Sequence, residues 1–229
     1  MNPFKKLFSD LRVFRRAFLI KSWTVIHSQY GEDAVLQHLM TQPRGVYVDV
    51  GCWHPKKFSN TWFLYRRGWR GVNIDLGEIK IRTFQWVRPE DYNVVAAVSD
   101  RPGSVTVQTD KDFSVGEQIV LEGQGSRPGF GQSRVMETRT LTDILDHSPF
   151  AGKTIQLLNI DAEGHDLHVL KGLDFDRYAP ETVLVESYVQ SLEDLTAAEL
   201  HGFLSGKGYR LFNWVGPTLF YKRQRLATA

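Results

Sequence analysis

The sequence predicts one α/β domain built on a parallel sheet with helices on its faces. Short apolar runs typical of strands alternate with helical patterns from residue 46 onward, which favours parallel strands joined by helices. Several of these runs end in an acid or a small polar residue, as expected where the edge of a sheet binds a ligand. The composition, with 42% hydrophobic and 24% charged residues in a chain of 229, excludes a disordered or fibrous protein.

The first 23 residues carry a local excess of positive charge. Six bases against the single acid Asp10 give this stretch +5, whereas the whole chain carries only +2. A helical wheel separates its apolar residues from its bases, so we interpret residues 1–27 as a basic amphipathic helix. It is too charged to span a bilayer, and it either docks on an anionic membrane or packs on its own domain or in a homodimer. The apolar side contains Phe4, Leu7, Phe8, Leu11, Phe14 and Phe18, and the other side contains Lys5, Lys6, Arg12 and Arg16.

The cellular setting follows from a few absences in the sequence. Cys52 is the single cysteine, and the chain begins without a signal-peptide pattern. We therefore expect a cytoplasmic protein, with peripheral contact at the inner membrane face if the first helix binds lipid. No basic stripe with interleaved aromatic residues continues into the domain, so nucleic acid is not an expected partner.

The first half of the domain contains three predicted strands. Before them, the polar run SQYGED at residues 28–33 either caps a following helix or folds over a ligand, which makes Gln29 a candidate binding residue. β-Branched and aromatic residues predict a strand at 46–50, stopped by Pro55. A helix that ends before Gly68 is predicted next. In order, the expected elements are a strand at 46–50, a helix at 59–67, and strands at 71–75 and 94–98.

Beyond residue 101 the pattern changes. Residues 105–107 and 135–137 read as two strands of an added β-ribbon, around an insertion at about 108–134. Its central part, Gly116–Gly131, is rich in Gly, Ser and Gln, and a loop of this length is functional or mobile. We expect it to act as a lid. The remaining elements are expected as a helix at 140–145, a strand at 154–160, a helix at 167–172, a strand at 182–185, a helix at 195–204, and a closing antiparallel hairpin of 209–212 with 218–221.

Acids and small polar residues follow the predicted strands. Because ligands bind beyond the carboxyl ends of the strands in an open parallel sheet, we expect these residues to converge on one crevice. Any single acid at a strand end is more often a helix cap, but several coincide here. The candidates are Asp49 with Gly51, Asp75, Ser99 with Asp100, Asp161 with Glu163, and Glu186.

The glycine pattern narrows the ligand class. A dinucleotide or a polyphosphate needs several glycines so that phosphates can approach the backbone, whereas bulky residues follow Gly51. A single glycine suits the tail of a zwitterionic nucleoside. Asp75 at the end of the second strand can accept hydrogen bonds from ribose hydroxyls. S-adenosylmethionine is such a ligand, with Gln29, Asp49, Gly51, Asp75, Ser99 and Asp161 as the candidate cofactor residues.

Several ordered motifs resemble the FkbM family of S-adenosylmethionine-dependent methyltransferases. They are SQYGED, VDVGCWHP, FSNTWFLYRRGWRGVNID, NIDAEGHDLHVLKGLDF and VLVES, and they span about residues 28–186. The resemblance implies a class I methyltransferase (Rossmann-like) fold over residues 28–229, with a seven-stranded sheet of order 3-2-1-4-5-7-6 in which the last-numbered strand is antiparallel. It also implies methylation of hydroxyl groups on sugars or natural products.

Methyl transfer to an alcohol needs a group that removes the hydroxyl proton next to the methyl donor. Asp161, Glu163 and His165 are the catalytic candidates, and His54 is a second candidate base that more simply shapes the cofactor loop. The alternative is a Mg²⁺ ion, held by Asp161 and Glu186, that lowers the pKa of a sugar diol. The sequence therefore predicts O-methylation of a sugar hydroxyl on a glycan or glycosylated metabolite. A non-catalytic, membrane-associated binding module with the same fold is the competing interpretation.

Overall fold

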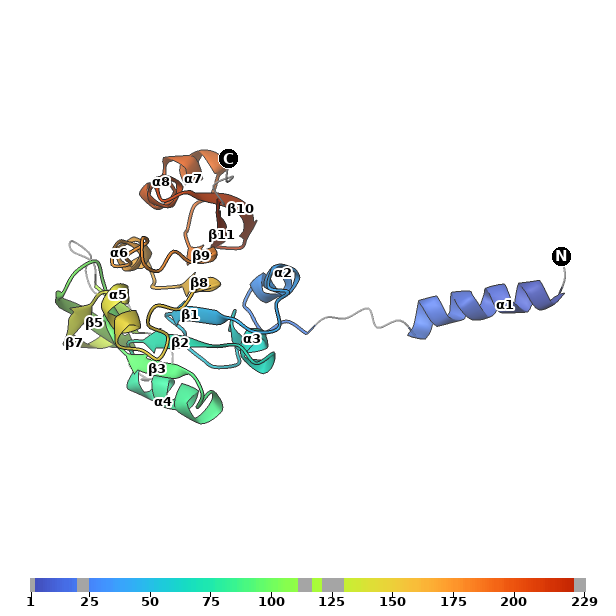
Figure 1. Cartoon of the computed structure of the whole chain (residues 1–229), viewed down its shortest axis with the longest axis horizontal. Coiled ribbons are helices and arrows are strands. Elements are labelled where there is room, and N and C mark those ends of the chain that lie inside the picture. The colour runs from blue at the N-terminus through green and yellow to red at the C-terminus, as the bar shows by residue number, and fades with distance from the viewer. Residues whose placement is uncertain (1–2, 20–24, 111–116, 121–129, 225–229) are drawn as a thin grey trace.

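The computed structural model describes residues 3–19, 25–110, 117–120 and 130–224, and its centre is a seven-stranded sheet (Figure 1). The strand order is β3-β2-β1-β8-β9-β11-β10. Strand β11 runs antiparallel to both of its neighbours, and the other pairs are parallel. This confirms the expected order and the antiparallel hairpin. The strands are β1 (Val46–Val50), β2 (Arg70–Asp75), β3 (Tyr92–Val95), β8 (Leu157–Ile160), β9 (Thr182–Glu186), β10 (Tyr209–Val215) and β11 (Thr218–Arg223).

Helices cover both faces of this sheet. One face packs against α2 (Glu32–Leu39) and α3 (Trp62–Arg66), and α4 (Glu78–Val87) lies beside β2 and β3. The opposite face packs against α5 (Leu141–Asp146) and α6 (Asp166–Lys171), together with the helices that precede the hairpin. Those last two helices are α7 (Leu192–Ala197) and α8 (Glu199–Gly206).

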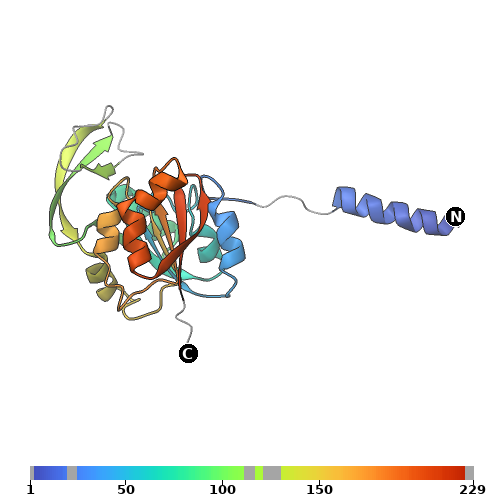
Figure 2. The same cartoon turned by 90° about the horizontal axis from the view of Figure 1, so that it is seen from above.

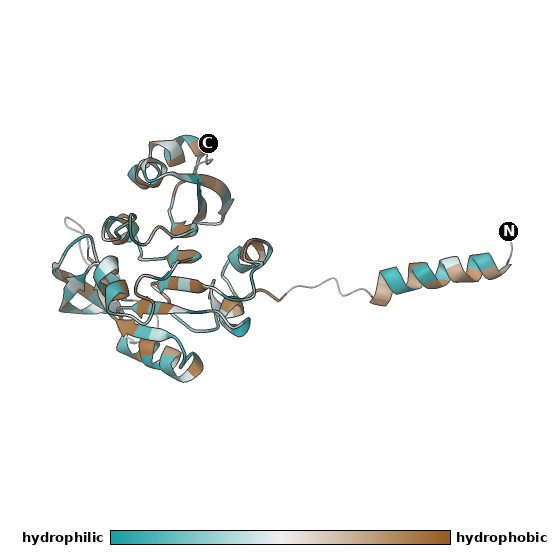
Figure 3. Cartoon of the chain, viewed as in Figure 1, coloured by the Kyte–Doolittle hydropathy of each residue, from teal (hydrophilic) through white to brown (hydrophobic). Residues whose placement is uncertain are grey.

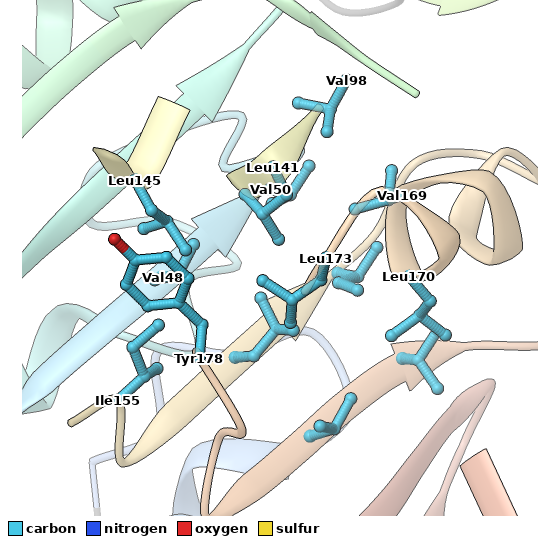
Figure 4. Packing of buried hydrophobic residues seen from close by; sticks show 14 of the residues in the cluster. Val48, Val50, Val98, Leu141, Leu145, Ile155, Val169, Leu170, Leu173 and Tyr178 are labelled. Atoms are coloured by element: carbon cyan, nitrogen blue, oxygen red, sulfur yellow. The ribbon is translucent and has the colours of Figure 1, made fainter. Parts of the chain in front are cut away.

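Alternation along the strands separates the two cores. In β1, Val48 and Val50 point into the larger core, whereas Tyr47 belongs to the core under α2 and α3. Figure 4 shows Val48 and Val50 packed among the side chains that α5 and α6 supply. Because β1 is buried on both faces, its sequence reads as a nearly continuous apolar run rather than as an alternating one.

A second, four-stranded sheet lies between Ala97 and Arg139, a wider range than the expected insertion at about 108–134 (Figure 2). Val105 pairs with Met136 and Thr106 with Val135, which confirms the predicted ribbon. The predicted strand at 94–98 is wrong as one unit, because the chain leaves the main sheet at Ala96 and enters the second sheet. Much of Gly116–Gly131 lies outside the described residues. The strands are β4 (Ala97–Val98), β5 (Gly103–Asp110), β6 (Glu117–Ile119) and β7 (Phe130–Arg139).

Two helices differ from the prediction. The sequence did not indicate α4, because its periodicity is mixed: Ile81 and Phe84 are buried, but Trp86 is 85% exposed. The single helix expected at 195–204 is divided, since Ala198 is extended and separates α7 from α8.

The N-terminal segment is helical, as predicted. Helix α1 (Pro3–Phe14) continues as a π-helical stretch η1 (Arg15–Leu19), and residues 20–24 lie outside the described part of the chain. Figure 3 shows apolar and polar residues alternating along α1. Across the described ranges, the structure contains no helix with the length and hydropathy needed to cross a bilayer.

Candidate active site

Three adjoining cavities open where β1, β2 and β8 end. The largest, here called the main cavity, has a volume of about 340 Å³. The convergence expected from the strand-end residues is therefore present in the structure. Predicted site residues that line the main cavity are Gln29, Asp49, Gly51, Asp75, Asp161 and Glu163.

Gly51 allows the close approach that forms the cavity. Its φ is +76°, and an added Cβ would lie 1.7 Å from the carbonyl oxygen of Asp161. No other residue type fits that approach without moving the backbone. The Gly51 N–H donates to the carbonyl of Ile74 at 2.9 Å, which fixes the loop after β1 against β2. Gly51 thus brings the ends of β1, β2 and β8 together.

Asp49 lies at the floor of the main cavity and is 2% exposed. It accepts hydrogen bonds from Thr61 Oγ1 at 2.6 Å and from Asn159 Nδ2 at 2.8 Å. Burial raises the pKa of Asp49, and these two donors oppose that shift. Asn60 donates to Asn159 Oδ1 at 3.0 Å, so Asp49 orients two amide side chains that line the cavity above it.

A fully buried arginine supports this floor from below. Arg88, at the end of α4, donates to Thr61 Oγ1 and to Ser59 Oγ, each at 2.8 Å, and to the carbonyl of Pro55. Its positive charge lowers the pKa of Asp49 against the effect of burial. The loop between β1 and α3 is therefore held in shape by a buried cation that the sequence analysis did not single out.

Asp75, the predicted ribose acceptor, is already part of a polar network. Its Oδ1 accepts from Gly77 N–H at 2.9 Å and from Lys80 Nζ at 3.0 Å, and its Oδ2 accepts from Trp53 N–H at 3.0 Å. Lys80 also lies 3.7 Å from Glu117 of β6. Residues of the second sheet thus reach the predicted ribose position.

A narrow apolar slot adjoins the main cavity beyond Asp75. Its volume is about 50 Å³, and it shares Gly51, Asp75 and Asp161 with the main cavity. Glu117, Gln118 and Ile119 of β6 line one wall, so the inserted strand closes this end of the site. The other apolar lining residues include Ile74, Leu76, Ala96, Val98 and Val169.

An outer cavity of about 30 Å³ lies on the opposite side of the main cavity. It is lined by residues from the N-terminal polar run, the end of β9 and the closing hairpin, among them Tyr30, Glu186 and Thr218. Asp161 lines all three cavities. Asp161 therefore lies between the predicted cofactor site and the outer cavity.

Asp161 and Glu186 form a close carboxyl pair. Asp161 is exposed toward the cavities but packed by protein on its other sides, and burial together with the carboxylates of Glu186, Asp166 and Glu163 raises its pKa well above the ordinary range. Burial also raises the pKa of Glu186. Among the described residues, no fixed donor reaches Glu186 Oε2, so a proton on Asp161 can satisfy it. Once Asp161 is protonated, the two carboxyl groups can share that proton.

The turn that follows β8 is stabilised by the carboxylate of Asp166. Asp166 is buried and accepts from the N–H groups of Ala162 at 3.0 Å and Gly164 at 3.0 Å. Glu163 has a φ of +52°, an uncommon conformation for a residue with a Cβ. This turn aims Glu163 at the main cavity and the apolar slot.

Ser99 and His165 lie together, away from the three cavities. Ser99 Oγ and His165 Nε2 are 3.0 Å apart, and neither residue lines any of these cavities. His165 also stacks on His168 with ring centroids 4.3 Å apart. Burial, and next the neighbouring His168, lower the pKa of His165 to about 4, so the ring is neutral at physiological pH. In this arrangement His165 connects β4 to α6.

The predicted metal ligands, Asp161 and Glu186, are two carboxylates rather than a larger cluster. Within the described ranges, no three or more His, Cys, Asp or Glu side chains are grouped so that they could hold a metal ion. Mg²⁺ on Asp161 and Glu186 stays a prediction.

Several lining residues were missed by the sequence analysis. Asn60 and Asn159 lie within or beside predicted elements, but an amide side chain in a sequence does not by itself indicate a binding site. Glu117 and Gln118 lie in the insertion, about forty residues along the chain from Asp75, and only the fold brings them to the site. Phe58 lines both the main and outer cavities, and its aromatic neighbours suggested only helix surface.

Comparison with known families agrees with the geometry. The model of the methyltransferase FkbM domain matches residues 44–211, which is more than half of the chain. The chain belongs to the FkbM methyltransferase family. This family membership identifies the protein as an S-adenosylmethionine-dependent methyltransferase.

Other comparisons are more distant. No curated protein sequence matches the chain significantly. Among solved structures, a TehB-like SAM-dependent methyltransferase from Corynebacterium glutamicum is similar at 13% identity and a TM-score of 0.44, with 96% of this chain and 97% of that chain covered. A similarity of this strength says nothing about the acceptor.

The cavities fit the cofactor that the FkbM family implies. Asn60 Oδ1 is buried and accepts no hydrogen bond from the described residues, which suits the ammonium group of S-adenosylmethionine. Asp75 Oδ2 keeps a lone pair free for a ribose hydroxyl. The apolar slot would take the flat adenine ring between Ile74 and Ile119.

Proposed function

We propose that this FkbM methyltransferase methylates a sugar hydroxyl on a glycan or glycosylated metabolite, with Asp161 as the general base. The observation that carries the proposal is the position of Asp161, which lines the cofactor cavities and the outer cavity at once. A hydroxyl group of an acceptor that reaches into the outer cavity would lie beside this carboxyl group. A base must lie within hydrogen-bond reach of the proton that it removes.

The raised pKa of Asp161 supports this role. S-adenosylmethionine supplies the methyl group when bound. In the transfer of that methyl group to the acceptor oxygen, Asp161 would accept the proton that the hydroxyl group gives up. An ordinary carboxylate is a weak base for an alcohol, and burial together with the carboxylate of Glu186 makes Asp161 a stronger one. Glu186 then shares the proton that Asp161 receives.

An aromatic pair at the entrance supports a sugar as the acceptor. Trp53 and Phe58 stack with ring centroids 5.4 Å apart, and Phe58 is 47% exposed where the main and outer cavities meet. The C–H face of a sugar ring packs well on such a flat apolar surface. Both residues hold left-handed backbone conformations, with φ of +49° and +53°. Strain of this kind is common at ligand-binding sites.

The test is a methyl-transfer assay on a panel of alkyl glycosides, in which the release of S-adenosylhomocysteine is measured. We expect a glycoside with free hydroxyls to be methylated and its fully O-methylated counterpart to be inert. Asp161→Asn should lower kcat by roughly 10²- to 10⁴-fold, because it removes the base. Calorimetry with S-adenosylmethionine should still detect binding to this variant.

The matched control is Asp176→Asn, an exposed change of the same kind outside the cavities. It should leave kcat within twofold, as expected for a surface substitution. Methylation of an amino sugar at nitrogen, or full activity of Asp161→Asn, would contradict the proposal.

A further inference from the structure

The N-terminal helix, defined as α1 together with η1, is the largest feature that the catalytic function does not use. Its apolar face is open to solvent over its whole length. The six residues of that face are between 54% exposed, for Phe14, and 73% exposed, for Phe18. The rings of Phe14 and Phe18 are 5.0 Å apart, so the face continues from α1 into η1. In both views this helix lies apart from the sheet and its covering helices (Figures 1 and 2).

The polar face of the same helix is strongly basic. Five bases stand against Asp10 alone within residues 3–19, which gives this segment +4. Residues 24–229 carry −3. A basic face beside an aromatic and leucine face is the pattern of helices that lie in the plane of a membrane interface. Lys5, Lys6, Arg12 and Arg16 lie on the polar face, and Arg15 lies next to the apolar face.

We propose that the N-terminal helix docks this methyltransferase on an anionic lipid surface. The phenylalanine and leucine side chains enter the boundary between headgroups and acyl chains, and the bases contact lipid phosphates. A helix of residues 3–19 is about 25 Å long, so it lies along the surface rather than across the bilayer. The catalytic domain is thereby held near acceptors that are themselves attached to lipid.

Charge favours lipid over a second copy of the chain as the occupant. The apolar positions 4, 7, 11, 14 and 18 follow a heptad spacing, which two helices could in principle share. Pairing two copies would bring ten bases and only two acids into one short bundle, where like charges repel. An anionic surface instead attracts every base, and each one near such a surface strengthens binding by roughly fivefold.

The experiment is flotation of the full chain with two kinds of vesicle, phosphatidylcholine alone and phosphatidylcholine mixed with phosphatidylglycerol. We expect flotation with the mixed vesicles, weakened by added salt, and little with phosphatidylcholine alone. Lys5→Gln with Lys6→Gln should weaken binding about 25-fold. Phe8→Ser with Phe14→Ser should weaken it by at least about tenfold, because two apolar side chains no longer enter the interface.

Matched controls make the same changes outside the helix. Trp86→Ser removes an aromatic side chain that is 85% exposed on α4, and Lys207→Gln with Lys222→Gln removes two exposed bases. Both controls should bind mixed vesicles as the wild type does. Calorimetry with S-adenosylmethionine checks that each variant is folded.

Three results would overturn the proposal. The first is the absence of flotation with mixed vesicles at low salt. The second is binding that neither helix variant weakens. The third is a dimer in sedimentation that Phe8→Ser with Phe14→Ser dissociates, without vesicle binding, since the apolar face would then be covered by a second copy.

Discussion

At the residue scale, the behaviour of the site depends on one carboxyl pair. Asp161 and Glu186 lie close enough to share a proton, and Tyr188 Oη donates to Glu186 Oε1 at 2.9 Å. That donor stabilises charge on Glu186, while burial and the other acids destabilise charge on Asp161. The negative charge of the pair therefore favours Glu186, and Asp161 holds the proton more tightly.

The pair predicts how activity changes with pH. Asp161 acts as a base only when deprotonated, so kcat/KM should rise with pH through its raised pKa. Glu186→Gln removes the negative charge that contributes to that shift, so the pKa of Asp161 falls. The acidic limb of the kcat/KM profile should then move to lower pH. Glu199→Gln, an exposed acid paired with Lys171 on the surface, should leave the limb unchanged.

An acidic limb that stays in place in Glu186→Gln would show that another group titrates. A limb that moves to higher pH would contradict the sign of the coupling, since removing a neighbouring negative charge cannot raise the pKa of a carboxyl group by electrostatics.

At the element scale, Arg88 joins the end of α4 to the loop between β1 and α3. The guanidinium is fully buried, and it stacks between Phe84 and Trp62, 4.9 Å and 5.5 Å from their ring centres. Its hydrogen bonds to Pro55, Ser59 and Thr61 hold the loop on which Trp53 and Phe58 stand. The shape of the site entrance thus depends on the end of α4, a helix whose Lys80 also lines the main cavity.

Replacing this cation should be costly. Arg88→Met keeps much of the apolar stem but leaves Asp49 and Asp91 without their buried positive charge, and we expect the free energy of unfolding to fall by about 3–5 kcal/mol. Urea denaturation measures the change. Arg177→Met breaks an exposed pair with Asp146 and should change the free energy of unfolding far less, because solvent screens that pair. Equal effects of the two substitutions would contradict a special role for Arg88.

The elements that the sequence predicts correctly are those with a single dominant pattern. Strand β1 is apolar throughout because both faces are buried, and Gly216 with Pro217 gives the closing hairpin a clear turn. Helix α4 was not predicted, because the exposed Trp86 and Ile79 interrupt the helical spacing of its apolar residues. The break at Ala96 was not predicted either, because a continuous apolar run does not show that its two halves pair with different sheets.

The residues of the candidate site also differ in how clearly the sequence predicts them. Asp49, Gly51, Asp75 and Asp161 could be predicted because parallel topology brings strand ends to one edge. Glu117 comes from the insertion, and its approach to Lys80 depends on how the second sheet folds back. No local pattern encodes such long-range contacts. Ser99 and His165 carry the right chemistry at strand or helix ends, yet the structure pairs them with each other.

At the scale of the whole molecule, the predicted cofactor position lies between two sheets with different roles. The seven-stranded sheet supplies the acids at its strand ends, and β6 of the second sheet closes the apolar slot. The second sheet has a small core of Ala97, Val107 and Ile119, whereas the main sheet is buried on both faces. The main sheet thus supplies the proposed base, and the inserted sheet covers the predicted cofactor position.

The N-terminal helix adds a third unit whose separation is testable. Its apolar face is exposed rather than packed on the domain, so removing residues 1–23 should leave the midpoint of thermal unfolding within about 2 °C, since no core contact is lost. Affinity for S-adenosylmethionine, measured by calorimetry, should also be unchanged. Leu36→Ala provides the contrast: Leu36 of α2 is fully buried, so the change should lower the free energy of unfolding by about 2–5 kcal/mol. A large loss of stability in the shortened chain would mean that the helix packs on the domain in solution.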